Sequence, residues 1–369
     1  MRNSGVSIVI ATKGRVRLLG ELLESLQAAI EKAPCPCEII LVDDSDDRDT
    51  EGIRDIAERY NARIISFGPS VSAKRNKGAE ESNYDIILFL DSDCLATPDL
   101  ICEHYIQYTD ASIIAVAGLL EFTGADTWFW NVVAASPYVM WFSFPKHMPT
   151  VPWAPTANCS VLKERFLEVG GFDTGFPNKP GGEDVDLGLR LQSDGKMMKC
   201  NPKALVYHQK ETWQSPKGMM KRLWNYGVAD CYLMERHPEI LFPTYPRKTL
   251  LYIGLVVLGI SLASTLSPLV LAVLLGAILI DLMLTALFMN KYEKKGISFL
   301  QQIVTQLLLI NNEAGFIWGC LKRRRPKYLF RQLIYLDGQA YGTADRGALL
   351  SMAHAISLLT FVLVVLALF

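Results

Sequence analysis

The stretch Ile86-Ile-Leu-Phe-Leu-Asp-Ser-Asp93 indicates the fold class of the chain. Its apolar residues form a short, continuous hydrophobic run, which is typical of a strand buried on both faces of a sheet. The D-x-D that follows places two carboxylates directly at the end of this strand. Ligands of open α/β sheets bind beyond the carboxyl ends of the strands, so polar side chains at that edge are candidates for function.

Other apolar runs of the same kind lie on both sides of this one, and helical patterns separate them. They cover residues 6–11, 38–43, 63–67 and 113–120. Strands that alternate with helices predict an α/β domain with a mostly parallel sheet, which we assign to residues 1–245. The first strand runs into Thr12 and Arg15, and the second runs into Asp43 and Asp44, so three strands end in polar residues.

Composition excludes several classes of protein. The 369 residues include 37 basic and 38 acidic ones, half of the chain is apolar and 20% is charged. A disordered chain would be less apolar, and an electrostatic nucleic-acid binder would carry a basic excess, so we expect no nucleic-acid partner. Eight cysteines in a chain of this length make no dense disulfide framework, and we expect free thiols in a reducing compartment.

Two long apolar stretches follow the predicted α/β domain. Residues 250–289 contain a single formal charge, with Ser267-Pro268 near the middle, and residues 349–369 contain none. Each half of the first stretch, and the whole of the second, would reach roughly 25 to 32 Å as a helix, close to the thickness of a bilayer core. The sequence therefore predicts a transmembrane hairpin over residues 246–290 and a transmembrane helix over residues 349–369. A buried helical hairpin in a soluble protein is the alternative.

Basic residues flank residues 297–320 on both sides. They are Lys291, Lys294 and Lys295 before the segment, and Lys322, Arg323, Arg324, Arg325 and Lys327 after it. Because basic flanks favour the cytoplasmic side, the segment is expected to start and finish there, and we place it flat on the membrane as an amphipathic helix within a cytosolic region, residues 291–348. Six apolar residues share one face of this segment: Ile297, Leu300, Ile303, Val304, Leu307 and Leu308. Six polar residues are expected to interrupt any continuous apolar surface: Gln301, Gln302, Gln306, Asn311, Asn312 and Glu313. A fourth span is the alternative. The prediction is a multi-pass protein of the cell membrane whose N-terminal domain faces the cytoplasm.

The polar strand ends and several further motifs resemble glycosyltransferase family 2, whose members have the GT-A fold. The matching pieces are Val6-Ser-Ile-Val-Ile-Ala-Thr12 with Arg15, Ile39-Ile-Leu-Val-Asp-Asp44, Ala73-Lys-Arg-Asn-Lys-Gly78, Ile87-Leu-Phe-Leu-Asp-Ser-Asp93, Gly170-Gly-Phe-Asp173 and Gly182-Glu-Asp-Val-Asp-Leu-Gly-Leu-Arg-Leu191. The resemblance implies a Rossmann-like GT-A domain with a mixed, mostly parallel sheet, followed here by an α-helical transmembrane and interfacial region. One departure is Ala11, where many relatives have proline.

The resemblance also implies which residues bind the donor, a nucleotide-sugar. The expected substrate-binding residues are Thr12, Arg15, Asp43, Asp44, Arg75, Asn76, Asp91, Glu183, Arg222 and Trp224. Among them, Asp43 or Asp44 is expected to contact the nucleobase, and Arg75 and Asn76 are expected to lie near the nucleotide. Arg222 is a candidate phosphate contact, with a solvated basic helix face as the alternative. The Q-x-x-R-W motif of processive polysaccharide synthases is absent from this region, which argues against a polymerising synthase.

Metal binding is expected at the D-x-D. Two carboxylates at one strand end can aim oxygen ligands at a hard cation, and Mg²⁺ or Mn²⁺ bound by few carboxylates plus substrate phosphates suits this site. By resemblance, Asp91 and Asp93 hold the ribose and the metal, and His208 is the third metal ligand. Turn-forming aspartates and a hydrogen-bonded structural histidine are the alternatives.

Catalysis of sugar transfer needs a carboxylate that removes the proton of the attacking hydroxyl. The resemblance implies that Asp184, beside Glu183, is this base, with a carboxylate favoured by the N-terminal dipole of a helix as the alternative. Attack opposite the departing diphosphate implies inversion. Seven aromatic residues lie between positions 128 and 144. Core packing is the default interpretation of such a cluster, and our hypothesis is that this segment lies at the bilayer surface and guides a lipid-linked acceptor.

The sequence thus predicts a metal-dependent, inverting glycosyltransferase of the hexosyltransferase type, acting on a lipid-linked or membrane-associated glycan acceptor. A polyprenyl-phosphate sugar synthase of the dolichyl-phosphate-sugar type is one alternative, in which the acceptor is already ionised and needs no base. A non-catalytic membrane scaffold that binds nucleotide-sugars is another.

Overall fold

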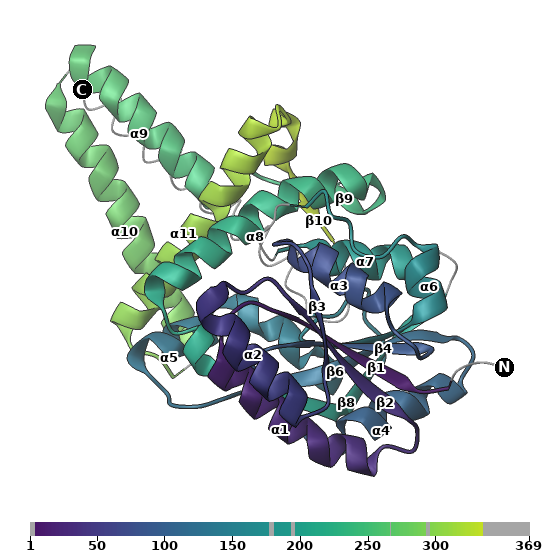
Figure 1. The fold of residues 1–369 in the computed structure, drawn as a ribbon. Coiled ribbons are helices and arrows are strands. Elements are labelled where there is room, and N and C mark those ends of the chain that lie inside the picture. Colours follow the sequence, from purple (N-terminus) through teal and green to yellow (C-terminus); the bar gives the residue numbers. More distant parts are fainter. Residues whose placement is uncertain (1–3, 177–180, 193–195, 266, 293–295, 335–369) are drawn as a thin grey trace. The chain divides into compact units, whose positions relative to one another are not determined.

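The computed structural model describes residues 4–176, 181–192, 196–265, 267–292 and 296–334 (Figure 1). The chain divides into two compact units, the first formed by Met1–Asp126 with Pro137–Trp213 and the second by Thr127–Ser136 with Gln214–Phe369. The predicted C-terminal transmembrane helix, residues 349–369, lies outside the described residues, as do residues 293–295 and 335–348 of the predicted cytosolic region before it.

The first unit is built on an eight-stranded mixed sheet with the order β3-β2-β1-β4-β7-β6-β8-β5. The strands are β1 Val6–Thr12, β2 Cys37–Asp43, β3 Arg63–Ser66, β4 Ile86–Asp91, β5 Cys94–Ala96, β6 Ile113–Thr123, β7 Asn158–Leu162 and β8 Met197–Gln209. Only β5 and β7 run antiparallel to their neighbours, so the predicted mixed, mostly parallel sheet is confirmed.

Helices cover both faces of this sheet. One face carries α1 Val16–Lys32, α2 Asp47–Arg59 and α4 Leu100–Tyr105, with the short helix η1 Ile106–Thr109 after α4, and the other face carries α3 Val71–Glu80, α6 Lys163–Glu168 and α7 Glu183–Leu191 (Figure 1). Two further short helices, η2 Pro137–Lys146 and η3 Lys210–Thr212, complete the unit.

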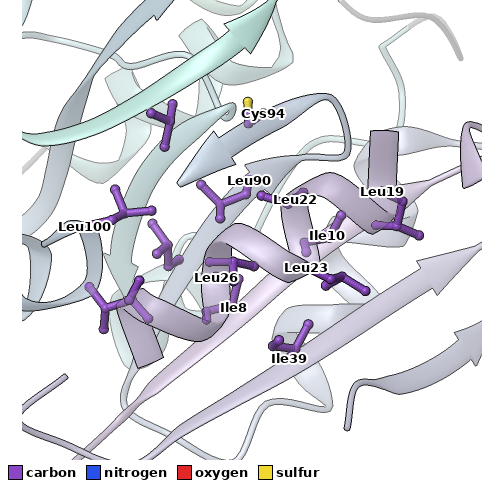
Figure 2. Close-up of a cluster of buried hydrophobic side chains, with 14 of the residues drawn as sticks. Ile8, Ile10, Leu19, Leu22, Leu23, Leu26, Ile39, Leu90, Cys94 and Leu100 are labelled. Carbon is purple, nitrogen blue, oxygen red and sulfur yellow. The ribbon is translucent and has the colours of Figure 1, made fainter. Parts of the chain in front are cut away.

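Hydrophobic burial fixes the position of α1. Its leucines recur at helical spacing, and Figure 2 shows Leu22 and Leu26 directed at the side chains of Ile8 and Ile10 on β1. All four side chains are fully buried, and each contributes about 1.5 to 3 kcal/mol through its burial. Because side chains alternate along a strand, β1 turns Val9 to the opposite face, where α3 packs.

Strand register brings the polar strand ends together. Thr12 at the end of β1 lies beside Asp43 of β2, and Ala11 lies beside Asp91 of β4. These neighbours are at the carboxyl ends of three parallel strands. The expectation that the polar residues share one edge of the sheet is therefore confirmed.

The second unit is mainly helical. Its elements are α5 Trp128–Ala134, α8 Pro216–Arg236, η4 Pro238–Ile240, β9 Leu241–Pro243, α9 Lys248–Thr265, α10 Pro268–Tyr292, α11 Phe299–Lys322, η5 Pro326–Phe330 and β10 Arg331–Leu333. Glycine lets α8 and α11 approach closely, because a Cβ on Gly227 would lie 2.0 Å from the carbonyl oxygen of Asn312. The Asn312 side chain donates a hydrogen bond of 2.9 Å to the Leu223 carbonyl of α8.

Two helices of the second unit, α9 and α10, are long and apolar enough to cross a membrane. They pack against each other as an antiparallel hairpin (Figure 1), and its predicted crossing of a membrane stays a prediction. The helix α11 covers most of the predicted amphipathic segment. Of the polar residues expected to interrupt its apolar surface, Asn311 is partly exposed. Gln301, Gln302 and Gln306 are buried, because the inner side of α11 meets hydrogen-bonding groups, including the Trp128 carbonyl of α5.

Candidate active site

A buried lysine joins the ends of β1 and β2. Lys74 on α3 donates a hydrogen bond of 2.6 Å to the Thr12 carbonyl and forms an ion pair with Asp44. Lys13 also reaches Asp44, at 3.2 Å. Burial acts to raise the pKa of the Asp44 carboxyl, but the two lysines outweigh it and hold the pKa below its usual range. Asp44 is therefore a carboxylate fixed in place at this edge of the sheet.

The neighbouring Asp43 is fixed by its own turn. Its carboxylate accepts hydrogen bonds from the Ser45 hydroxyl at 2.6 Å and from the Ser45 backbone N–H at 3.2 Å. The Ser45 hydroxyl in turn accepts a hydrogen bond from the Gly14 N–H at 2.6 Å. Both predicted nucleobase contacts thus belong to one hydrogen-bonded edge that includes the end of β1.

The second carboxylate of the D-x-D is buried between a guanidinium and an imidazole. Asp93 pairs with the Arg15 guanidinium at 2.9 Å, and His208 Nε2 lies 3.4 Å from the other Asp93 oxygen. Arg15 holds a left-handed backbone with φ of 60°. Such a conformation is uncommon for a residue other than glycine, and strain of this kind gathers at functional sites.

His208 is oriented by its surroundings. Its ring packs against Phe122 and Trp213, with centroids 5.6 and 5.8 Å away, and its Nδ1 lies 3.4 Å from the Gln209 carbonyl oxygen. Because a carbonyl oxygen only accepts, this contact favours the tautomer with the proton on Nδ1. The Asp93 oxygen beside Nε2 is also an acceptor, so Nε2 would have to be unprotonated for His208 to bind a cation together with Asp93.

Three potential ligand atoms meet at this point. Those of Asp93, Cys94 and His208 all lie within 4.8 Å of one another. Burial, followed by the nearby Asp93 charge, raises the pKa of the Cys94 thiol well above its ordinary value, and the thiol donates to the Ala157 carbonyl at 3.7 Å. A protonated thiol is a poor ligand for a hard cation, so the oxygen and nitrogen of Asp93 and His208 are what fit Mn²⁺ or Mg²⁺.

Arg75 connects the D-x-D to the helix that carries the predicted base. This buried guanidinium lies 2.9 Å from Asp91 and 3.2 Å from Glu183. The other Glu183 oxygen accepts a hydrogen bond of 2.7 Å from the Gly181 N–H. Asp91 therefore points to Arg75 and is not among the ligand atoms that meet at Asp93, as far as the described residues show.

Asn76 acts on the backbone of the Gly170–Asp173 motif. Its side-chain nitrogen donates to the Phe172 carbonyl, its oxygen accepts from the Phe172 N–H, and both hydrogen bonds measure 2.8 Å. The carboxamide is thus engaged by one backbone segment. Its predicted place near the nucleotide stays a prediction.

Asp184 stands in the first turn of α7. The helix begins after Gly182, whose φ of 84° is readily adopted only by glycine. Burial, and then the charge of Glu183, raise the pKa of the Asp184 carboxyl to about 7. A carboxylate with a pKa near the operating pH is suited to accept a proton, which is what a general base does.

The remaining predicted residues lie elsewhere. Arg222 and Trp224 are half-buried on α8 in the second unit, whereas the other predicted site residues belong to the first unit. Sequence analysis did not predict the ion pair between Asp186 and Arg190 on α7. The i, i+4 spacing of the two residues is the signal that could have indicated it. Arg190 also donates to the Val169 and Gly171 carbonyls, so it ties the Gly170–Asp173 motif to α7.

The N-terminal part of the chain matches a known family. Residues 7–160 match the family model described as Glycosyl transferase family 2. This part of the chain is therefore similar to glycosyl transferase family 2. The match contains the edge of the sheet with Thr12, Asp43, Asp44, Asp91 and Asp93.

Several curated proteins that are similar to this chain are sugar transferases. Validoxylamine A glucosyltransferase of Streptomyces hygroscopicus subsp. limoneus is 29% identical over 232 residues, which cover 52% of this chain and 48% of the relative. The glucosyl-dolichyl phosphate glucuronosyltransferase of Haloferax volcanii is 26% identical over 224 residues, with 55% and 69% covered. The chain spans about half the length of the glucosyltransferase relative.

A solved structure shares the fold. The chain is similar to the mannosyltransferase PcManGT from Pyrobaculum calidifontis in complex with GDP-Man and Mn²⁺, with a TM-score of 0.56 and 15% identity. The likeness covers 86% of this chain and 88% of that chain. At this identity it bears on the fold alone, and it confirms the predicted GT-A-like architecture.

Proposed function

We propose that this chain is a metal-dependent, inverting glycosyltransferase that moves a hexosyl group from a nucleotide-sugar to a hydroxyl acceptor. The observation that carries the proposal is the single edge of the sheet where Asp93 lies beside His208. Arg75 links the same edge to the helix of Asp184. The family match and the sugar-transferase relatives support it.

Asp93 and His208 would hold the cation, which when bound stabilises the negative charge that develops on the departing diphosphate. Arg15 would hold the same diphosphate, since its guanidinium already lies at Asp93 and its side chain is half-exposed. Asp43 and Asp44 would orient the nucleoside.

Asp184 would take the proton of the acceptor hydroxyl at its carboxylate oxygen. Burial and the charge of Glu183 keep its pKa near neutral, so this group accepts a proton readily. Attack from the face opposite the diphosphate inverts the anomeric centre. Arg75 would hold Glu183, and through it the start of α7, at a fixed distance from the donor site.

The acceptor would be a lipid-linked or membrane-associated glycan. The two helices that are long and apolar enough to cross a membrane, α9 and α10, support this class, as does the name of the Haloferax relative. We place the protein in the cell membrane as a multi-pass protein with its catalytic domain in the cytoplasm. The outward leucines of α11 would rest on the membrane surface, among them Leu300 and Leu307.

The test is release of nucleoside diphosphate from a panel of nucleotide-sugars by the full chain in detergent, with Mn²⁺, Mg²⁺ or EDTA. We expect release with one donor when a polyprenyl-linked sugar is present, and its loss in EDTA. A different result would identify a polyprenyl-phosphate sugar synthase instead. In that case polyprenyl phosphate alone would support release of nucleoside diphosphate, and Asp184→Asn would not diminish this release. No metal-dependent release with any donor would contradict the proposed function.

A further inference from the structure

The second unit exposes an apolar stripe along α11. Leu300, Leu307, Trp318 and Leu321 are 49 to 59% exposed. Their spacings of 7, 11 and 3 residues place them along one side of an α-helix. Asn311, which is partly exposed, lies on the same side between Leu307 and Trp318. Large apolar side chains gathered on one side of a helix mark a surface that meets something other than water.

The opposite side of α11 explains why this stripe is not core. Gln302, Gln306 and Asn312 are less than 9% exposed, so polar side chains occupy the inner side. Thr305 reaches the Val132 carbonyl of α5, and Asn312 reaches α8. The helix thus turns these polar side chains, together with the apolar Phe316 and Ile317, against protein. It leaves the four large apolar side chains of the stripe exposed.

Positive charge follows the stripe at its C-terminal end. Lys322, Arg324 and Lys327 are exposed, and residues 322–331 contain no acidic residue. Arg323 and Arg325 lie in the same segment, but their charges are balanced, because Glu235 of α8 forms an ion pair with each of them.

An apolar side chain also emerges within this basic segment. Tyr328 and Leu329 are buried against α8 and α11, which leaves Phe330 53% exposed. The exposed surface therefore combines an indole, leucine, a phenyl ring and three cationic side chains.

We propose that this surface, formed by Trp318, Leu321, Lys322, Arg324, Lys327 and Phe330, binds anionic phospholipids. The inference rests on the membrane placement in the proposed function and adds the class of lipid. Tryptophan favours the headgroup level of a bilayer, and lysine or arginine beside it attracts negative headgroups. Zwitterionic lipid would satisfy the apolar side chains but would leave the three cations without a counter-charge.

Trp318 supplies a probe at the site. The full chain is reconstituted in phosphatidylcholine nanodiscs that contain a minor fraction of phosphatidylglycerol. Brominated chains, which quench indole fluorescence on contact, are carried either by the phosphatidylglycerol or by an equal number of phosphatidylcholine molecules. The difference between the wild-type protein and Trp318→Phe isolates the signal of Trp318.

We expect brominated phosphatidylglycerol to quench Trp318 at least about twofold more than brominated phosphatidylcholine at low salt. The combined change Lys322→Gln, Arg324→Gln, Lys327→Gln should equalise the two lipids. The matched control Arg48→Gln, Arg54→Gln, Arg59→Gln removes three charges from α2 in the first unit and should keep the difference.

The outcomes separate the two proposals. Equal quenching of Trp318 by both lipids in the wild-type protein overturns the anionic-lipid site and leaves the membrane placement standing. Quenching by neither lipid overturns the membrane placement as well. Neither result bears on whether the first unit transfers a sugar.

Discussion

A helix of the first unit and a helix of the second treat polar side chains differently, although both bury apolar ones. In the first unit, α1 buries Leu22 and Leu26 and leaves its polar residues outside. In the second unit, α11 buries Gln302 and exposes Trp318 and Leu321. Exposed apolar side chains are favoured where the surroundings are apolar, so the contrast agrees with the membrane placement that we propose for the second unit.

Buried polar groups also differ in kind between the units. The first unit gathers ionised groups at one edge of its sheet, where Arg75 lies between Asp91 and Glu183. The polar interior of α11 consists largely of neutral amides and hydroxyls bonded to backbone carbonyls, such as that of Gln301 to Trp128. We therefore expect changes at the edge of the sheet to affect activity and changes inside α11 to affect stability.

The largest expected effect is that of Asp184→Asn. We expect the rate of sugar transfer to fall by about 10³-fold or more, because the acceptor hydroxyl loses its base, while donor and metal binding persist. The melting temperature should stay or rise. A carboxyl whose pKa is higher in the folded than in the unfolded chain costs stability at neutral and higher pH, and asparagine removes that cost.

Steady-state kinetics and thermal melting of the same preparation check this prediction. Glu164→Gln, on the exposed side of α6, is the matched control and should leave both readouts unchanged. Transfer at the wild-type rate by Asp184→Asn would show that this carboxylate is not the base.

In the second unit, Gly227→Ala should lower the free energy of unfolding by about 3 kcal/mol, because the new methyl group would overlap the Asn312 carbonyl and force α8 and α11 apart. Chemical denaturation in detergent measures the loss. Gly254→Ala on α9 is the control, since nothing lies within 4 Å of its Cβ position. Equal stability of the two variants would mean that the helices do not pack as closely as described.

The pH dependence of turnover sharpens the assignment of the first unit. Asp184 has a pKa of about 7 and must be ionised to accept a proton. We expect kcat/KM to fall about tenfold for each pH unit below 7 and to level off above it. A flat profile between pH 5 and pH 8 would contradict a base with this pKa.

The smallest expected effect is that of Gln301→Leu. Loss of its hydrogen bond to the Trp128 carbonyl, and of its capping contact with Ser298, should cost about 1 kcal/mol of stability even though leucine is the more apolar residue. Leu300→Gln, one residue earlier and 59% exposed, is the mirror change and should cost less in detergent. Stabilisation by Gln301→Leu would mean that the inner side of α11 is an ordinary apolar core.

Much of the first unit was predictable because its signals are local. Short apolar runs identified β1 and β4, and the D-x-D located the polar edge. Strand β7 was missed because its five residues, from Asn158 to Leu162, include polar ones that bond inside the sheet. Lys74 was missed because lysine on a helix is usually solvated, and only the tertiary fold places it between Thr12 and Asp44.

The inner side of α11 was not predictable for a related reason. Helical periodicity separates two sides of a helix, but it does not say which side meets protein. That choice is made by partners distant in the sequence, the carbonyls of Trp128 on α5 and Leu223 on α8.

Calorimetric titration of UDP and GDP into the full chain, with Mn²⁺ or with EDTA, tests the central claim most directly. We expect one of the nucleotides to bind the wild-type protein only when Mn²⁺ is present, and Asp93→Asn to lose that metal-dependent binding. Equal binding in EDTA, or by Asp93→Asn, would contradict the claim that a cation at Asp93 and His208 holds the diphosphate of the donor.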